Sequence, residues 1–269
     1  DKKIFDTEEL KLIYADLFNI IDVRKIEFSA KNNFSFNVNE TLKFNNFKLE
    51  SIIDLNQLTI NQKNLKLKPY FPNFVEEIKL EKHKIIINYN KNKFNIKGNG
   101  NILLDDKLDN LSYQIIKDNN NLLFNSKINL KNNSLAIDFL DYKKKEGLNS
   151  IVLVKGNFKK NNQLRLDLIK IKEKNNEISV RGLNLSKNFK IIDVENFNFN
   201  YENNKKIFNK LNLKKDNSTF IIAGESFDAS KIIDNIIDRD EEDASIFDNL
   251  NTKINIKIKK TYIDEVNYI

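Results

Sequence analysis

The chain has 269 residues, of which 40% are hydrophobic, so it is long enough for one large folded domain and is not a disordered chain. Its formal net charge of +7 would suit an anionic partner, but arginine occurs only at Arg24, Arg165, Arg181 and Arg239. Arginine is the preferred residue for bidentate contacts to bases and phosphates, so this composition argues against sequence-specific nucleic-acid binding. Without cysteine, the chain has no disulfide, no thiolate metal site and no thiol nucleophile.

The first predicted element is a helix over residues 7–21. Its apolar side chains recur at three- and four-residue spacing, which places them on one face of the helix. These residues are Leu10, Ile13, Leu17 and Ile20. Asp6 is the candidate N-cap, because Glu9 follows three positions later as in a capping box.

Short runs of alternating apolar and polar residues extend from about residue 26 to the C-terminus and predict a series of β-strands. A period of two is that of a strand with one buried face and one solvated face. Clusters rich in Asn and Lys separate the runs, and Asn suits tight turns because it tolerates positive φ. The sequence therefore predicts an antiparallel meander of about seventeen strands with one apolar face.

The best candidate for an internal boundary lies near residues 69–77, in what is otherwise predicted to be a single elongated domain over residues 1–269. Pro69 and Pro72 bracket two aromatic residues there. Because proline cannot donate to the ladder of a central strand, this segment is predicted to be a connection or an edge.

A second helix is predicted over residues 226–239, inside a helical insertion that runs to residue 250. Four isoleucines form a stripe at helical spacing, with Ser226 or Asp228 as the cap. The acidic stretch that follows begins like the calcium-binding loop of an EF-hand. Its sixth position is Asp243 rather than glycine, however, and its twelfth is Asn249 rather than glutamate. We therefore predict no metal site.

Other residues that could carry chemistry do not combine into a site. His83 is the only histidine, so it has no partner for a zinc site, and its lysine neighbours predict a position on the polar face of a strand. The segment Gly98–Gly100 lacks the Lys-Ser/Thr of a phosphate loop and is interpreted as a bulge or a close contact within the sheet. The sequence therefore predicts a protein that is not an enzyme and binds no cofactor.

Function must then come from the apolar face of the sheet. Two short helices cannot cover such a face, so the sheet either packs on itself as a closed core or curls into an open groove that holds an apolar ligand. Strands of six to eight residues would make the groove about 20 to 27 Å wide, close to the length of an acyl chain. The candidate lining residues are Ile85, Ile87, Phe94, Ile96, Leu164, Leu166, Leu168, Phe197, Phe199 and Tyr201. A register error of one residue would move them to the other face.

Residues 220–233, with the sequence FIIAGESFDASKII, resemble the strand, glycine, Phe-Asp-Ala and short-helix element of the AsmA-like superfamily. The resemblance is to its YhdP branch in particular, which is related to TamB. The residues of this element are Gly224, Ser226, Phe227, Asp228 and Ala229. Residues 178–201 also resemble the hairpin units of that family, whereas Ser230 stands where the family often has arginine followed by proline.

The resemblance implies a mostly β protein whose curled, open groove carries phospholipids across the periplasm of a Gram-negative bacterium. It implies acyl chains as the ligand, and contacts with the inner and outer membranes through segments outside this chain, including an inner-membrane anchor. The chain begins with Asp and contains no methionine, so we expect it to be a fragment. Two alternatives stay open: a structural or outer-membrane-assembly domain with a closed core, and a basic nucleic-acid binder, which the composition disfavours.

Overall fold

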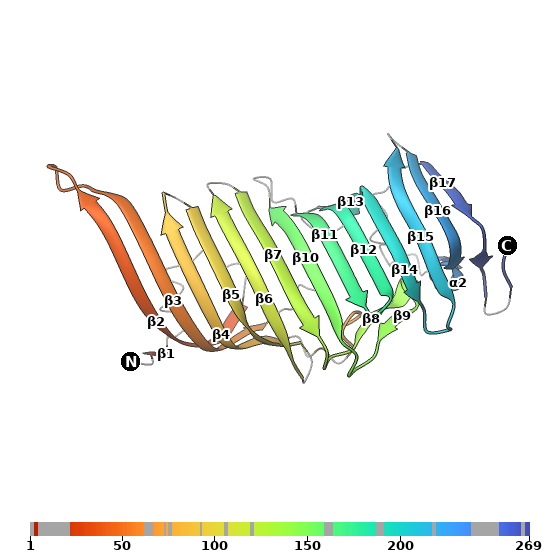
Figure 1. Ribbon diagram of the computed structural model, residues 1–269, viewed down its shortest axis with the longest axis horizontal. Helices are drawn as coiled ribbons and strands as arrows, with labels where there is room; N and C mark the ends of the chain where they lie inside the picture. The colour runs from red at the N-terminus through yellow and green to blue at the C-terminus, as the bar shows by residue number, and fades with distance from the viewer. Residues whose placement is uncertain are drawn as a thin grey trace. The chain divides into compact units, whose positions relative to one another are not determined.

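The computed structural model of the chain describes residues 3–4, 22–61, 67–72, 74, 77–91, 93–104, 107–118, 121–158, 164–186, 191–216, 219–237, 253–264 and 267–269. Within these residues the protein is mostly β, as predicted, and its antiparallel strands do not close into a barrel (Figure 1). The chain divides into two compact units, residues 1–133 and residues 134–269. The predicted helix over 7–21 and the acidic stretch after the second helix lie outside the described residues.

The first unit is a meander in which strands pair in chain order. Its strands are β1 (Lys3–Ile4), β2 (Asp22–Val38), β3 (Phe44–Asn61), β4 (Glu77–Asn90), β5 (Lys93–Leu103), β6 (Leu108–Asp118) and β7 (Asn121–Leu130). Every described pair is antiparallel. Several strands are longer than the six to eight residues predicted, since β3 has 18 residues and β4 has 14.

The second unit contains a similar meander and a small additional sheet. The meander consists of β10 (Ser150–Phe158), β11 (Leu164–Glu173), β12 (Asn176–Leu185), β14 (Asn196–Glu202), β15 (Phe208–Asp216), β16 (Thr219–Asp228) and β17 (Lys253–Ile258), with β13 (Ile191–Asp193) beside β12 and β18 (Thr261–Tyr262) beside β16. The small sheet pairs β8 (Leu135–Ile137) with β9 (Tyr142–Lys144), and the 3-10 helix η1 (Asp138–Leu140) joins them. The meander departs from antiparallel order where β16 pairs with β17 and β18 in parallel.

The second predicted helix is observed as α2 (Ser230–Ile237), which starts later than the predicted 226–239. Strand β16 continues through Asp228, because its last two residues pair with Thr261 and Tyr262 of β18. The Asp228 carboxylate then accepts a hydrogen bond of 3.0 Å from the Ser230 backbone N–H. Asp228, one of the two predicted caps, therefore holds the start of this helix.

The segment near residues 69–77, where the sequence suggests an internal boundary, lies inside the first unit. It connects β3 to β4, which pair with each other in register on either side of it. The backbone N–H groups of Tyr70 and Phe71 both donate to the Leu67 carbonyl at 2.9 Å. The prolines thus lie in a connection between neighbouring strands, and the division between the units falls after Asn133.

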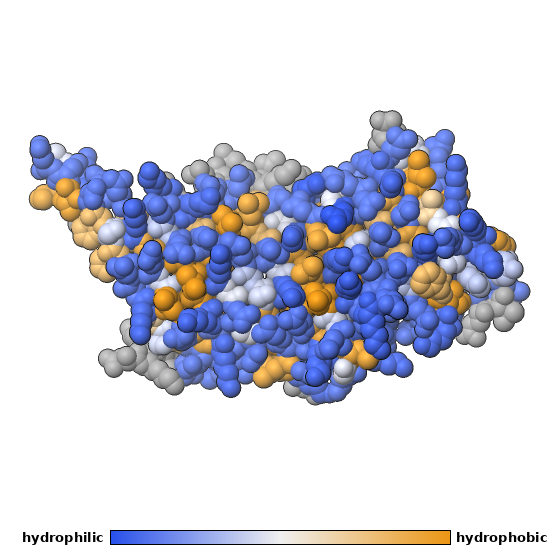
Figure 2. Space-filling view, in the orientation of Figure 1, coloured by the Kyte–Doolittle hydropathy of each residue, from blue (hydrophilic) through white to orange (hydrophobic). Residues whose placement is uncertain are grey.

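Each unit has an apolar face and a polar face. Directly paired residues of antiparallel strands lie on the same face, so the register defines both. In the first unit one row contains Ile87, Ile96, Ile115 and Phe124, and we call its face the first apolar face. In the second unit the corresponding row contains Val152, Ile171, Ile178, Phe199 and Leu211, and we call its face the second apolar face. Figure 2 shows one side of the molecule, on which hydrophilic atoms predominate and hydrophobic atoms form separate patches.

Candidate functional site

The first apolar face changes from buried to exposed along its strands. Leu55, Ile102 and Leu130 are buried, and they lie toward the end of the face where β2 begins. Toward the opposite end, Phe34 is 61% exposed and Phe94 is 36% exposed. Large apolar side chains therefore lie uncovered at one end of the face that is otherwise the core of the unit.

Five aromatic residues at this end form what we call the aromatic patch: Phe34, Phe36, Phe47, Tyr89 and Phe94. The rings of Tyr89 and Phe94 have centroids 4.5 Å apart, and those of Phe47 and Tyr89 lie 5.8 Å apart. Phe34 and Phe36 stack at 6.3 Å. Such ring pairs stabilise one another, but four of the five side chains still meet solvent. A contiguous exposed apolar patch of this kind marks a ligand or partner site.

The structure brings four predicted lining residues together on this face. Ile85 pairs with Gly98, Ile87 with Ile96, and Tyr89 with Phe94, so Ile85, Ile87, Ile96 and Phe94 share one face of β4 and β5. The three isoleucines are half-buried. The aromatic patch continues this surface, and its β2 and β3 members were not among the predicted lining residues.

The second apolar face is covered where the prediction placed groove residues. Phe199 is 7% exposed and packs against the ring of Tyr201, which is fully buried under the segment β8–η1–β9. The rings of Tyr142 and Tyr201 meet edge to face at 5.7 Å. The Tyr201 hydroxyl donates to the Leu140 carbonyl at 2.8 Å, and the Tyr142 hydroxyl donates to Glu173 at 2.7 Å. Phe199 and Tyr201 are therefore part of a packed core.

Burial raises the pKa of both phenols far above the usual value. For Tyr142 the hydrogen bond to Glu173 adds to this effect, and for Tyr201 the negative charges of Asp228 and Asp141 add to it. Both hydroxyls are consequently neutral donors, which suits a structural role in this core.

The predicted trio Leu164, Leu166 and Leu168 is split by a β-bulge. Leu164 and Leu166 pair with Phe158 and Gly156, whereas Leu168 pairs with Lys155 on one side and with Arg181 on the other. The register of β10 and β11 shifts between Lys155 and Gly156, which inserts one residue into the alternation. Leu168 therefore lies in a row with basic residues, and its assignment to the apolar lining is corrected.

The element that resembles the AsmA-like superfamily has a structural role, because it holds β16 against β15 and sets the start of α2. A Cβ at Gly224 would lie 2.5 Å from the Lys210 carbonyl oxygen, so only glycine fits beside the bulge at Glu225 of β16. Asp228 is buried and accepts hydrogen bonds from Asn203 Nδ2 at 2.8 Å and from the Ser230 hydroxyl at 2.6 Å.

The neighbouring residues of this element secure β16 in the same way. Ser226 Oγ donates to the Phe208 carbonyl at 2.5 Å. The backbone N–H groups of Phe227 and Ala229 donate to the carbonyls of Lys260 and Tyr262. The element therefore fixes how the strand leads into α2. No sequence pattern indicated that its partners would lie in the turn over residues 203–208.

His83 is buried on the first apolar face, not exposed on the polar face as predicted. The register of β4 and β5 shifts between Glu81 and Lys84, and Lys82 takes a positive φ of 53°. This bulge turns the imidazole inward until it is 1% exposed, where its Nε2–H donates to the Asn101 carbonyl at 2.9 Å. Burial lowers the pKa of His83, so the ring is neutral.

Two glycines of β5 make room for aromatic rings. A Cβ at Gly100 would lie 2.3 Å from the His83 ring, and a Cβ at Gly98 would lie 2.2 Å from the Tyr113 ring. The rings of His83 and Tyr113 are neighbours, with centroids 5.8 Å apart. The interpretation of Gly98–Gly100 as a close contact within the sheet is confirmed.

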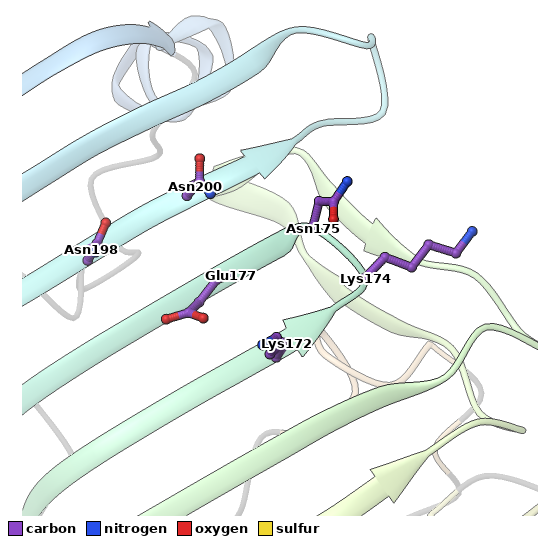
Figure 3. Close-up of a pocket in the computed structure, with 6 residues that line it drawn as sticks. All are labelled: Lys172, Lys174, Asn175, Glu177, Asn198 and Asn200. Carbon is purple, nitrogen blue, oxygen red and sulfur yellow. The ribbon is translucent and has the colours of Figure 1, made fainter.

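A shallow polar depression of about 520 Å³ lies on the polar face of the second unit (Figure 3). Its lining residues are Lys172, Lys174, Asn175, Glu177, Asn198 and Asn200. They come from β11, β12, β14 and the turn between β11 and β12. The Glu177 carboxylate forms an ion pair with Lys170 Nζ at 2.7 Å. This depression suits water and small polar solutes, because it offers neither an apolar wall nor a nucleophile beside a base.

Within the described residues, no group of three or more His, Asp or Glu side chains could hold a metal ion. The described part of the chain also has no helix that is long and apolar enough to cross a membrane. Comparison of the chain with protein-family models, with curated proteins and with solved structures finds no match. The first apolar face with its aromatic patch is therefore the candidate site, on the strength of its own geometry.

Proposed function

We propose that the first apolar face binds the acyl chains of phospholipids, and that the protein is a non-enzymatic lipid-binding module of an AsmA/YhdP-like envelope protein. The exposed aromatic patch, continuous with Ile85, Ile87 and Ile96, is the observation that carries this proposal. Contiguous exposed apolar side chains, such as Phe34 at 61% exposure and its aromatic neighbours, mark a surface that a ligand or partner covers.

The affinity would come from burial alone. Covering apolar surface stabilises a complex by roughly 25 cal/mol per Å², so an acyl chain lying along the face gains several kcal/mol without a specific polar contact. A passive binder needs no pair of acid and base and no cofactor. Head groups would stay in water at the rim, while the chains lie on the isoleucine and phenylalanine side chains.

Transport between two membranes follows from the same proposal. Nonspecific contacts would let acyl chains slide along the face, because neighbouring positions on it present similar apolar side chains. We place the protein in the periplasm, with an inner-membrane anchor outside this chain, on the strength of the resemblance around Gly224.

The test compares two adjacent isoleucines of β4 that point to opposite faces. Ile87 lies on the first apolar face, and Ile86 is 40% exposed on the polar face. Binding of a fluorescent phospholipid, together with mass spectrometry of lipids that copurify, should decrease at least about tenfold in Ile87→Asp and stay unchanged in Ile86→Asp. Equal binding by the two variants, with both folded, would refute the proposal.

The covered second apolar face favours a second candidate function for the second unit. Its packed core around Phe199 and Tyr201 would suit a structural or outer-membrane-assembly domain. A photoactivatable phospholipid distinguishes the two functions by where it crosslinks. Crosslinks confined to β2–β5 support lipid binding by the first unit, and their absence throughout supports a structural role for the whole chain.

A further inference from the structure

The β2–β3 hairpin extends beyond the rest of the first unit. The last paired residues of β3 and β4 are Lys48 and Asn90, whereas β2 and β3 continue to pair as far as Val38 and Phe44. Figure 1 shows this hairpin projecting past the turn between β4 and β5. Its tip therefore lacks the support of a third strand.

The turn at the tip is well defined. The Asn39 side-chain oxygen accepts hydrogen bonds from the Thr41 N–H at 3.1 Å, the Thr41 hydroxyl at 2.9 Å and the Lys43 N–H at 2.8 Å. The Leu42 N–H donates to the Asn39 carbonyl at 2.9 Å. Asn39 thus fixes the turn by capping its backbone donors.

The turn holds a leucine where an asparagine or glycine would fit better. Leu42 has a φ of 58°, in the left-handed region that a side chain branched like leucine rarely adopts. It is 79% exposed, and Val38 at the end of β2 is 48% exposed. A large apolar side chain is therefore kept in an unfavourable conformation at the exposed tip of the hairpin, which is typical of a functional position.

The hairpin that carries the apolar tip has a small excess of positive charge. The hairpin from Lys31 to its partner Ile52 contains Lys31, Lys43 and Lys48 against Glu40 and Glu50, and all five side chains are exposed. Lysines around an apolar surface suit an anionic membrane, because each basic residue near such a surface adds attraction while its stem lies along the apolar boundary.

We propose that the β2–β3 hairpin docks onto an anionic lipid bilayer by inserting Leu42 and Val38 into the interfacial region. The rings of Phe34, Phe36 and Phe47 follow behind the tip at headgroup depth, and Lys43 and Lys48 meet the lipid phosphates. Docking is a second property, separate from the binding of acyl chains by the first apolar face. It would place the aromatic patch next to a bilayer.

The decisive variant is Leu42→Asn. Asparagine tolerates a positive φ, so this substitution should leave the melting temperature unchanged or raise it. The loss of the inserted leucine should weaken cosedimentation with vesicles of phosphatidylcholine and phosphatidylglycerol about tenfold. The matched control is Leu123→Asn, because Leu123 is 47% exposed on the polar face, on the side of β7 away from the aromatic patch.

Charge and lipid binding are separated by two further measurements. Lys43→Glu should weaken binding to vesicles that contain phosphatidylglycerol severalfold and should not affect the residual binding to pure phosphatidylcholine. Ile87→Asp should retain vesicle binding even though it loses acyl-chain binding, so failure of docking and failure of the proposed function are distinguishable.

Three results would overturn the docking proposal. The first is unchanged vesicle binding by Leu42→Asn, and the second is an equal decrease in Leu42→Asn and Leu123→Asn. The third is a concentration-dependent increase in mass without lipid that Leu42→Asn abolishes, which would show that the hairpin binds a second copy of the chain.

Discussion

The two units share one strand pattern but differ in what lies on their apolar faces. In the second unit β8–η1–β9 packs over Tyr201, which is completely buried. In the first unit no described segment contacts Phe94 in this way, and its side chain remains 36% exposed. Alternation therefore determines which residues share a face, and a single short segment determines whether that face becomes a core or stays exposed.

The largest expected difference is between Phe199→Ala and Phe94→Ala. Truncating the buried Phe199 should lower the free energy of unfolding of the second unit by about 3–5 kcal/mol. Truncating Phe94 should cost about 1 kcal/mol or less, because much of its ring already meets water. Hydrogen exchange measured by mass spectrometry reports on each unit separately, and equal losses would contradict the distinction between a core and an open face.

A second substitution asks how tightly the covered end of the first apolar face is packed. Gly100→Ala would place a methyl group 2.3 Å from the His83 ring and must displace it. We expect a loss of about 1–3 kcal/mol in urea denaturation. Asn99→Ala, at the adjacent exposed position, is the control and should change stability by less than about 0.5 kcal/mol. A neutral Gly100→Ala would mean that this end is as loose as the aromatic patch.

The pH dependence of the first unit should reveal its buried histidine. Because burial lowers the pKa of His83 below 6.5, the unfolded chain takes up a proton before the folded chain does. The contribution of His83 to stability is thus complete above pH 6.5 and is lost as the pH falls toward the folded-state pKa. The slope is at most about 1.4 kcal/mol per pH unit. His83→Gln should remove this pH dependence of the free energy of unfolding, which thermal melts at a series of pH values measure. An identical pH profile in wild type and variant would contradict the prediction.

The smallest effect is expected on the polar face. Arg165 donates to Asp167 at 2.9 Å and to Glu195 at 2.8 Å, in contact with solvent. Arg165→Lys loses this double contact, and we expect a cost of less than about 1 kcal/mol that shrinks further at high salt. A salt-independent loss of several kcal/mol would show that the polar face contributes as much to stability as the core.

Much of the fold could be predicted because alternation is a local property. The shared face of Ile85, Ile87 and Ile96 follows directly from a period of two. The positions of His83 and Leu168 could not be predicted, because a single bulge residue reverses the faces and leaves no pattern of its own. The glycine pair at Gly98 and Gly100 was the one signal of close packing beside such a bulge.

Coverage of the apolar face could not be predicted for a different reason. The segment from Leu135 to Tyr142 looks like one more short strand, and nothing local tells that it lies across the sheet instead of extending it. The parallel pairing of β16 with β17 depends likewise on the return of the chain after α2. The exposed aromatic patch was missed because composition shows that Phe34 and Phe47 are apolar, but not whether another segment covers them.

The pairing of strands in chain order bears on how such a protein can change during evolution. Within each unit's meander nearly every strand contacts only its neighbours in the sequence, so a hairpin inserted or deleted at a turn disturbs one pair of interfaces and leaves the others in register. Each hairpin gained would widen the sheet by about 10 Å. Length is therefore a property that duplication can adjust in discrete steps, as in repeat proteins, without redesign of the surrounding strands.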